Sequence, residues 1–245
     1  MKGHWKSDFV HYWKSYLPPA RASPSDLDFI KNKIKEKIRE KKQEKIKILV
    51  LGSTPEYRNL CGEVGVPVTL LDFSRYNYEY LGKEIKNKTK EIFIEGDWLS
   101  TIPHEKYDII LADNVVNVLP KTETKKLLNN ISKIIEKEGW FMPRTYIREK
   151  NEHWTGEKAL RSYRKEGSKK PIYTWAMRNF YLAAYDYEED CTVLKNVWTI
   201  LKDLHTKGMI TDKEFEECKH FSFEDREFKF YIPVNEDLDK IFTRF

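Results

Sequence analysis

The chain has 245 residues, a length that fits one α/β domain with an added subdomain, or two small domains. Hydrophobic residues make up 40% of the sequence and aromatic residues 14%, so a large core can be buried. Lys and Arg number 44 against 39 Asp and Glu, and much of the net charge of +5 belongs to the lysine-rich run 31–47. Because a nucleic-acid groove needs more positive charge on one face, a nucleic-acid partner is not favoured.

Three scattered cysteines, Cys61, Cys191 and Cys218, form no C-x-x-C pair and lack metal-ligand spacing to the histidines. We therefore expect reduced thiols, no disulfide framework and no metal site. No apolar stretch reaches 18 residues, and the amino terminus has no signal-peptide pattern. The sequence predicts a cytoplasmic protein that does not enter a membrane.

Aromatic residues at helical spacing predict an amino-terminal helix over residues 4–17, which a proline-rich break follows. Ser25 is the predicted N-cap of the next helix. Continuous apolar runs then predict buried strands over 46–52, 68–73, 91–97, 107–113 and 139–147, with helices between them. This alternation predicts a doubly wound, mostly parallel α/β sheet.

The pattern changes after about residue 150. A polar, loop-rich stretch leads into predicted helices over 174–207 and from a Thr211–Glu214 capping box onward, and the alternation over 221–233 predicts a β-hairpin. We expect four regions: an amino-terminal helical lid (1–24), a ligand-binding core (25–150), a mostly helical cap or substrate region (151–220), and a hairpin that completes the sheet (221–245).

The ligand of an open α/β sheet lies beyond the carboxyl ends of its strands. Three of the predicted strands end in Asp72, Asp97 and Asp113, and three carboxylates suit a cationic, hydroxyl-bearing ligand better than a polyphosphate. The first turn has only Gly52, with Glu56 in the first turn of the next helix, so neither a dinucleotide fingerprint nor a P-loop is present.

Asp72 lies 20 residues after Gly52, the place from which a carboxylate accepts ribose hydroxyls; the alternative is that it caps the following helix. Asp97 and Trp98 have the position to bind and cover an adenine ring; the alternative for Trp98 is ordinary core packing. Asp113 and Asn114 close the fourth strand, where they could lie beside the ligand; the alternative is that they form a turn or a helix cap.

Five segments resemble, in order and spacing, the successive motifs of class I S-adenosylmethionine-dependent methyltransferases: ILVLGSTPEYRNL, LLDFSRYNYEYL, EGDWLS, YDIILADNVVNVL and IIEKEGWF. The resemblance covers about residues 26–147. It implies the Rossmann-like, seven-stranded methyltransferase fold, with 221–233 supplying an antiparallel edge, and S-adenosylmethionine as the cofactor. Val50 stands where the family often has an acid, and only one glycine of the family's loop is present.

The resemblance also assigns the cofactor site, motif by motif. The glycine loop corresponds to Gly52, Ser53 and Thr54, and the ribose site to Asp72 with Phe73. Asp97 and Trp98 match the adenine site, and Asp113 and Asn114 match the fourth motif beside the methionine moiety and the methyl-transfer site.

We expect methyl transfer to oxygen or nitrogen of a small-to-medium organic acceptor by in-line displacement. A general base is needed only for acceptors that are protonated at working pH, so the sequence assigns no catalytic residue. Aromatic residues outside the sheet are candidates for acceptor binding; the alternative is that they pack on the sheet. These residues are Trp5, Tyr12, Trp13 and Trp154.

Two alternative functions share the fold. One is an RNA or protein methyltransferase that uses a basic edge, and the other is a scaffold that binds S-adenosylmethionine without turnover. The basic edge consists of Arg161, Arg164, Lys165, Lys169 and Lys170. A nicotinamide enzyme is disfavoured because the second and third glycines of its fingerprint are missing.

Overall fold

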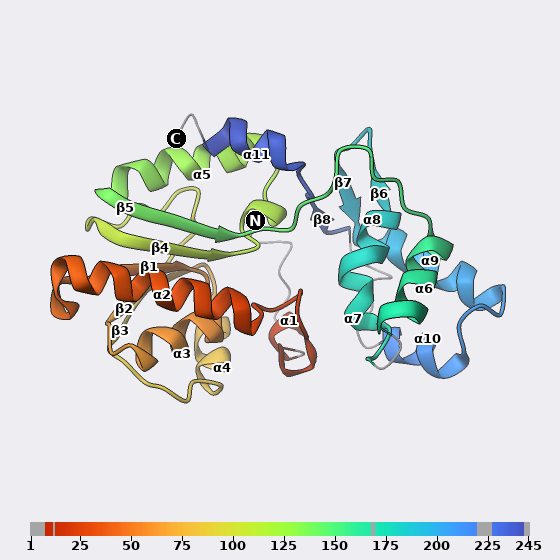
Figure 1. Ribbon diagram of the computed structural model, residues 1–245, viewed down its shortest axis with the longest axis horizontal. Coiled ribbons are helices and arrows are strands. Elements are labelled where there is room, and N and C mark those ends of the chain that lie inside the picture. Colours follow the sequence, from red (N-terminus) through yellow and green to blue (C-terminus); the bar gives the residue numbers. More distant parts are fainter. Residues whose placement is uncertain (1–7, 12, 168–169, 220–226, 243–245) are drawn as a thin grey trace. The chain divides into compact units, whose positions relative to one another are not determined.

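A computed structural model describes residues 8–11, 13–167, 170–219 and 227–242. The chain divides into two compact units (Figure 1). Unit 1 comprises Met1–Ser15, Ala22–Thr145 and Thr243–Phe245, and unit 2 comprises Tyr16–Arg21 and Tyr146–Phe242. No helix in the described part of the chain is long and apolar enough to cross a membrane.

Unit 1 is built on a parallel sheet whose strand order is β3-β2-β1-β4-β5. Its strands are β1 (Ile48–Leu51), β2 (Val68–Asp72), β3 (Glu91–Glu95), β4 (Tyr107–Asp113) and β5 (Ile135–Arg144). The central strand β1 pairs on one side with β2 and on the other with β4, so the strand order reverses beside it. The predicted doubly wound, Rossmann-like α/β fold is confirmed.

Helices cover both faces of this sheet (Figure 1). One face carries α2 (Pro24–Lys41), α3 (Pro55–Glu63) and α4 (Arg75–Gly82), and the other carries α5 (Lys121–Ile134). On the first face, α2 and α3 pack against alternate residues of β1, β2 and β4, and all of these alternate residues are apolar. Burial on both faces explains why β1, β2 and β4 read as nearly continuous apolar runs, whereas the edge strands β3 and β5 are only partly buried.

Helix α2 begins two residues earlier than the sequence suggests. Its N-cap is Ser23, whose hydroxyl accepts the Asp26 N–H while the Asp26 carboxylate accepts the Ser23 N–H, and Pro24 occupies the first helical position. The prediction of Ser25 as N-cap is wrong because this capping box satisfies two donors that a cap at Ser25 leaves unpaired.

The expectation of a seven-stranded sheet is also wrong: within the described residues the central sheet has five strands. Strand β8 (Lys229–Phe230) pairs antiparallel with β7 (Cys191–Val193), and β7 pairs with β6 (Tyr185–Asp186), in a separate sheet of unit 2. Phe230 is buried there against the rings of Tyr146 and Tyr181, so its apolar burial favours this pairing. Residues 220–226 of the expected hairpin lie outside the described residues.

The rest of unit 2 is mostly helical. It contains α6 (Gly156–Ser162), α7 (Tyr173–Trp175), α8 (Tyr181–Ala183), α9 (Leu194–Thr206), α10 (Asp212–Lys219) and α11 (Asn235–Phe242), with π-helical turns at Tyr163–Gly167 and Ala176–Phe180. The apolar stripe of α9 is buried, as its spacing predicts. Thr211 and Glu214 form the predicted capping box, since each accepts a backbone N–H of the other.

Candidate functional site

The carboxyl ends of β1, β2 and β4 lie beside one another at the point where the strand order reverses. The predicted glycine loop follows β1, Asp72 ends β2, and Asp113 ends β4. The sheet register therefore brings the residues of three predicted motifs to one edge, which we call the carboxyl edge.

The turn after β1 depends on the backbone freedom of Gly52. Its φ of +104° lies in a region that L side chains rarely adopt, and its N–H donates to the Leu71 carbonyl at 2.8 Å. A Cβ at this position would approach the Trp98 ring no closer than 3.8 Å, so backbone conformation and not space selects glycine. Ser53 and Thr54 are buried, and Thr54 is the N-cap residue of α3 although its side chain makes no capping bond.

Asp72 is a buried carboxylate that lies against this turn. The Ser53 hydroxyl donates to its Oδ2 at 2.6 Å, and the Ser74 N–H donates to its Oδ1 at 3.0 Å. The N-cap of α4 is Ser74, whose hydroxyl accepts the Asn77 N–H, so Asp72 is not the cap of that helix. Burial raises the pKa of Asp72, while the Ser53 hydroxyl and the backbone donors of Ser74 and Phe73 lower it.

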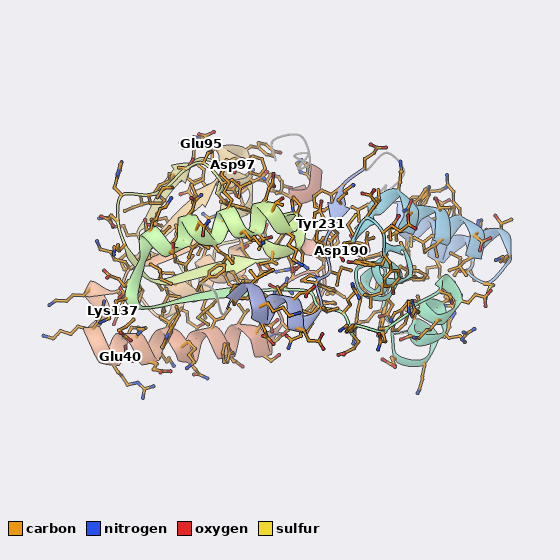
Figure 2. The ribbon with its side chains drawn as sticks, turned by 90° about the horizontal axis from the view of Figure 1, so that it is seen from above. Glu40, Glu95, Asp97, Lys137, Asp190 and Tyr231 are labelled. Atoms are coloured by element: carbon orange, nitrogen blue, oxygen red, sulfur yellow. The ribbon has the colours of Figure 1, made fainter. Side chains whose placement is uncertain are left out.

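Asp97 and Trp98 follow β3, where Asp97 lies beside Glu95 (Figure 2). The Oδ1 of half-buried Asp97 accepts the Leu99 N–H at 2.8 Å, which closes a turn. The Trp98 ring is buried against Gly52, and its Nε1 donates to the Leu71 carbonyl at 2.8 Å. Trp98 thus packs against the glycine turn and is hydrogen-bonded to β2.

Asp113 forms a buried ion pair with Arg144 at the ends of β4 and β5. Its Oδ1 lies 2.7 Å from the Arg144 Nε and 2.5 Å from a terminal guanidinium nitrogen. Its Oδ2, like the Oδ1 of Asn114, is buried and has no hydrogen-bond partner among the described residues. Burial raises the pKa of Asp113 to about 6, although the positive charge of Arg144 opposes the rise.

Two residues of this edge, Arg144 and Tyr57, were missed by the sequence analysis. Tyr57 in α3 is fully buried; burial and the charge of Asp113 raise the pKa of its hydroxyl, which Arg144 opposes. Tyr57 resembles any core aromatic residue in the sequence and gives no signal. Arg144 does give one, because it is the single charge in the apolar segment GWFMPRTYI.

The described part of the amino-terminal segment packs beside the carboxyl edge. The Trp13 Nε1 donates to the Glu56 carboxylate at 3.3 Å, in the first turn of α3. His11 of α1 (Asp8–His11) contacts Tyr76 and Tyr80 of α4. Of the predicted acceptor-binding residues, Trp5 and Tyr12 lie outside the described residues.

The remaining acceptor-binding candidate, Trp154, belongs to unit 2, where the Lys158 ammonium lies 4.5 Å from its ring centre. Among residues 8–11, 13–167, 170–219 and 227–242, no group of three or more His, Cys, Asp or Glu side chains has the arrangement of a metal site. The three cysteines are buried free thiols.

No protein-family model matches the chain, and no curated protein matches it in sequence. Among solved structures, the chain is similar in fold to a putative zinc-dependent alcohol dehydrogenase from Rhodobacter sphaeroides, at 16% identity and a TM-score of 0.58, over 96% of this chain and 85% of that one. It also matches an S-adenosylmethionine-dependent methyltransferase from Clostridium acetobutylicum at 17% identity and a TM-score of 0.46, over 57% and 56% of the two chains. The CcbJ methyltransferase from Streptomyces caelestis matches at 15% identity and a TM-score of 0.45, over 55% and 54%.

The chain therefore spans about half the length of these two methyltransferases. At 16% identity, the likeness to the Rhodobacter structure shows the fold alone and says nothing about the chemistry of the site.

Proposed function

We propose that unit 1 binds S-adenosylmethionine at its carboxyl edge and that the protein transfers the methyl group to oxygen or nitrogen of a small-to-medium organic acceptor. The observation that carries the proposal is the buried Asp72 carboxylate, held by Ser53 against the single-glycine turn. A carboxylate offers about four acceptor positions, so Asp72 keeps acceptor capacity for ribose hydroxyls after its protein donors are counted.

The charges of the edge support a cationic ligand over a pyrophosphate. The first turn of α3 carries the Glu56 carboxylate, Asp113 ends β4, and Asp97 follows β3. An incoming pyrophosphate would meet these carboxylates and a loop with one glycine, whereas a sulfonium with an adenosyl group would meet opposite charge and hydroxyl acceptors.

When bound, S-adenosylmethionine supplies an electrophilic methyl carbon, and the chemistry it needs from a protein is mainly alignment with the acceptor. In this assignment Asp72 binds the ribose hydroxyls, with Phe73 beside it. The backbone of the loop formed by Gly52, Ser53 and Thr54 lies against the cofactor. Asp97 binds the adenine amine, and Trp98 supports the loop from below. Asp113 and Asn114 offer the methionine moiety their buried oxygens, which accept no hydrogen bond from the described residues, while Arg144 fixes the Asp113 side chain.

The acceptor side of the proposal rests on the sequence pattern. We propose that region 1–24, whose Trp13 contacts Glu56, and region 151–220, which includes Trp154, select the acceptor. The buried, unpaired cysteines agree with a cytoplasmic location for such an enzyme.

Calorimetric titration with S-adenosylhomocysteine tests the cofactor assignment. We expect binding to the native protein and a loss of affinity on the order of a hundredfold in Asp72→Asn, because one acceptor of a charged hydrogen-bond pair becomes an amide. Glu105→Gln is the matched control. This exposed carboxylate precedes β4, at the opposite edge of the sheet, and pairs there with Lys47. NADH is titrated in parallel because the chain shares a fold with a putative dehydrogenase. Absence of S-adenosylhomocysteine binding by the folded protein, or tight NADH binding, would contradict the proposal.

A further inference from the structure

Arg148 occupies an unusual position in unit 2. Its backbone N–H donates to the Pro233 carbonyl at 3.1 Å, and it forms an isolated parallel bridge with Val234. Its side chain is only 12% exposed. The guanidinium carbon lies 4.6 Å from the ring centre of Tyr185 and 5.4 Å from that of Tyr187, so two aromatic rings hold the charge in place.

The ionic contact of this guanidinium is loose. A terminal nitrogen lies 3.6 Å from the Asp190 Oδ1, and the Nε is buried without a hydrogen-bond partner in the part of the chain that the structure describes. A guanidinium has five N–H donors in a planar fork that matches a carboxylate. Arg148 therefore has unused donor capacity in a position that its neighbours have fixed.

Asp190 occupies the outer side of this charge. It has a φ of +52°, its side chain is 63% exposed, and its Oδ1 accepts the Tyr185 hydroxyl at 2.5 Å. Tyr185 and Arg148 thus both contact one carboxylate oxygen, and that carboxylate belongs to a residue in an exposed turn. Because the Asp190 side chain is mostly exposed and lies 3.6 Å from Arg148, we expect this ion pair to contribute little, so a competing carboxylate has to overcome a factor of only about five.

Aromatic surface adjoins the pair. Tyr187 is 45% exposed, and the His153 ring lies 4.9 Å from it. The next residue, Trp154, has a buried Nε1 without a hydrogen-bond partner within the described residues. A ligand that combines a carboxylate with an aromatic ring would meet both the donors and this surface.

We propose that Arg148 and Tyr185 form a binding site for the carboxylate of a small aromatic acid, and that the Asp190 side chain occupies this site when the acid is absent (Asp190 is labelled in Figure 2). The site lies wholly in unit 2 and does not depend on the cofactor assignment made for unit 1.

Benzoate is the probe, its neutral analogue benzamide is the reference, and titration by calorimetry or ligand-observed NMR is the readout. Asp190→Asn keeps the side-chain shape and tolerates a positive φ, but it removes the competing charge. We expect this variant to bind benzoate about fivefold more tightly than the native protein. Glu189→Gln is the matched control: it removes one negative charge from the preceding residue, which pairs with Lys229, and we expect no change.

The donor side is tested in the Asp190→Asn background. Adding Arg148→Gln should weaken benzoate binding at least about tenfold, because a charge-assisted bond is lost. If that variant does not fold, Tyr185→Phe decides, since it keeps the ring beside Arg148 and removes only the hydroxyl; we expect roughly threefold weaker binding.

Three outcomes would overturn the inference: benzoate binding no tighter than benzamide in Asp190→Asn, equal affinities in Asp190→Asn and Glu189→Gln, or undiminished binding in both donor variants. Tighter binding of phenyl phosphate than of benzoate would also overturn the assignment to carboxylates. S-adenosylhomocysteine titration of Asp190→Asn should match the native protein, so a failure here is distinguishable from a failure of the cofactor proposal.

Discussion

Asp113 and Arg144 meet at the ends of β4 and β5, where one carboxylate oxygen takes both guanidinium contacts and the other has no partner among the described residues. Such a pair is expensive to bury, because desolvation of both charges offsets much of their attraction. The raised pKa of Asp113 expresses this cost: in the folded protein, the neutral acid is favoured over the carboxylate to an unusual degree.

This imbalance predicts a pH-dependent difference between the native protein and Asp113→Asn. The pKa of Asp113 rises from 3.8 to about 6 on folding, so the folded state binds the proton more tightly than the unfolded state does. Ionisation between about pH 4 and pH 7 therefore lowers the free energy of unfolding of the native protein, by up to about 3 kcal/mol. Asp113→Asn lacks this loss.

Urea unfolding of both proteins at several pH values measures the effect. We expect Asp113→Asn to become more stable relative to the native protein as pH rises through this range. Parallel stability curves would show that burial does not govern the ionisation of Asp113.

Gly52 offers a second test of the carboxyl edge. Gly52→Ala forces a side chain into a φ of +104°, which we expect to lower the free energy of unfolding by about 1–3 kcal/mol and to weaken S-adenosylhomocysteine binding. Gly208→Ala is the control, since Gly208 also has a positive φ, of +67°, and a Cβ there would meet no atom within 4 Å. It should cost stability and leave ligand affinity unchanged; equal affinity losses in both variants would contradict a role for the Gly52 turn.

The residues of the carboxyl edge were predictable to different degrees. Asp72 and Asp113 end apolar strands and Asp97 follows β3, and strand ends can be predicted from hydrophobicity. Their hydrogen-bond partners were not predictable, because Ser53 and Arg144 reach these carboxylates through the register of neighbouring strands. The Ser23 capping box was missed for a local reason: Ser23 and Ser25 both precede a helical pattern, and only the Asp26 contact separates them.

The pair Arg164–Glu214 joins the π-helical turn Tyr163–Gly167 to α10. Glu214 also completes the capping box of α10, so one carboxylate serves two elements. The hydrogen bonds from Arg164, followed by those from Thr211, lower the pKa of Glu214 to about 2. The stabilisation is therefore present above its ordinary pKa of 4.5 and is lost as the pH falls towards 2.

Glu214→Gln should destabilise α10 locally. It removes the charged partner of Arg164 and weakens the cap, a loss of about 1–2 kcal/mol. Hydrogen exchange of the α10 amides should accelerate correspondingly. Glu216→Gln, which removes an exposed pair with Lys219 in the same helix, is the control and should leave exchange unchanged. Equal protection in the two variants would contradict the role of Glu214.

The parallel sheet was predictable because β1, β2 and β4 read as buried runs between amphipathic helices. The number of strands was not. Alternation over 221–233 indicates strand content without indicating a partner, and β8 pairs with β7 in unit 2 and not with β5. Pairing between short strands depends on packing such as that of Phe230, which one sequence does not display.

The sheet should exchange its amide hydrogens unevenly. Residues of β1 are buried throughout and pair on both sides, whereas β3 is an edge strand with partly exposed residues. We expect β1 and β4 amides to exchange only through global unfolding and β3 amides to exchange through smaller openings. Mass-spectrometric exchange measures this, and β1 exchanging as fast as β3 would contradict the assigned strand order.

The position of β1 between β2 and β4 also matters while the chain is being made. Ile48 pairs with Ile109, so one side of the central strand has no partner until the ribosome has produced β4. During that interval an apolar strand edge is open to other nascent chains. Slow translation before β4 would lengthen this exposure, and we expect soluble yield in a heterologous host to depend on the elongation rate between β1 and β4.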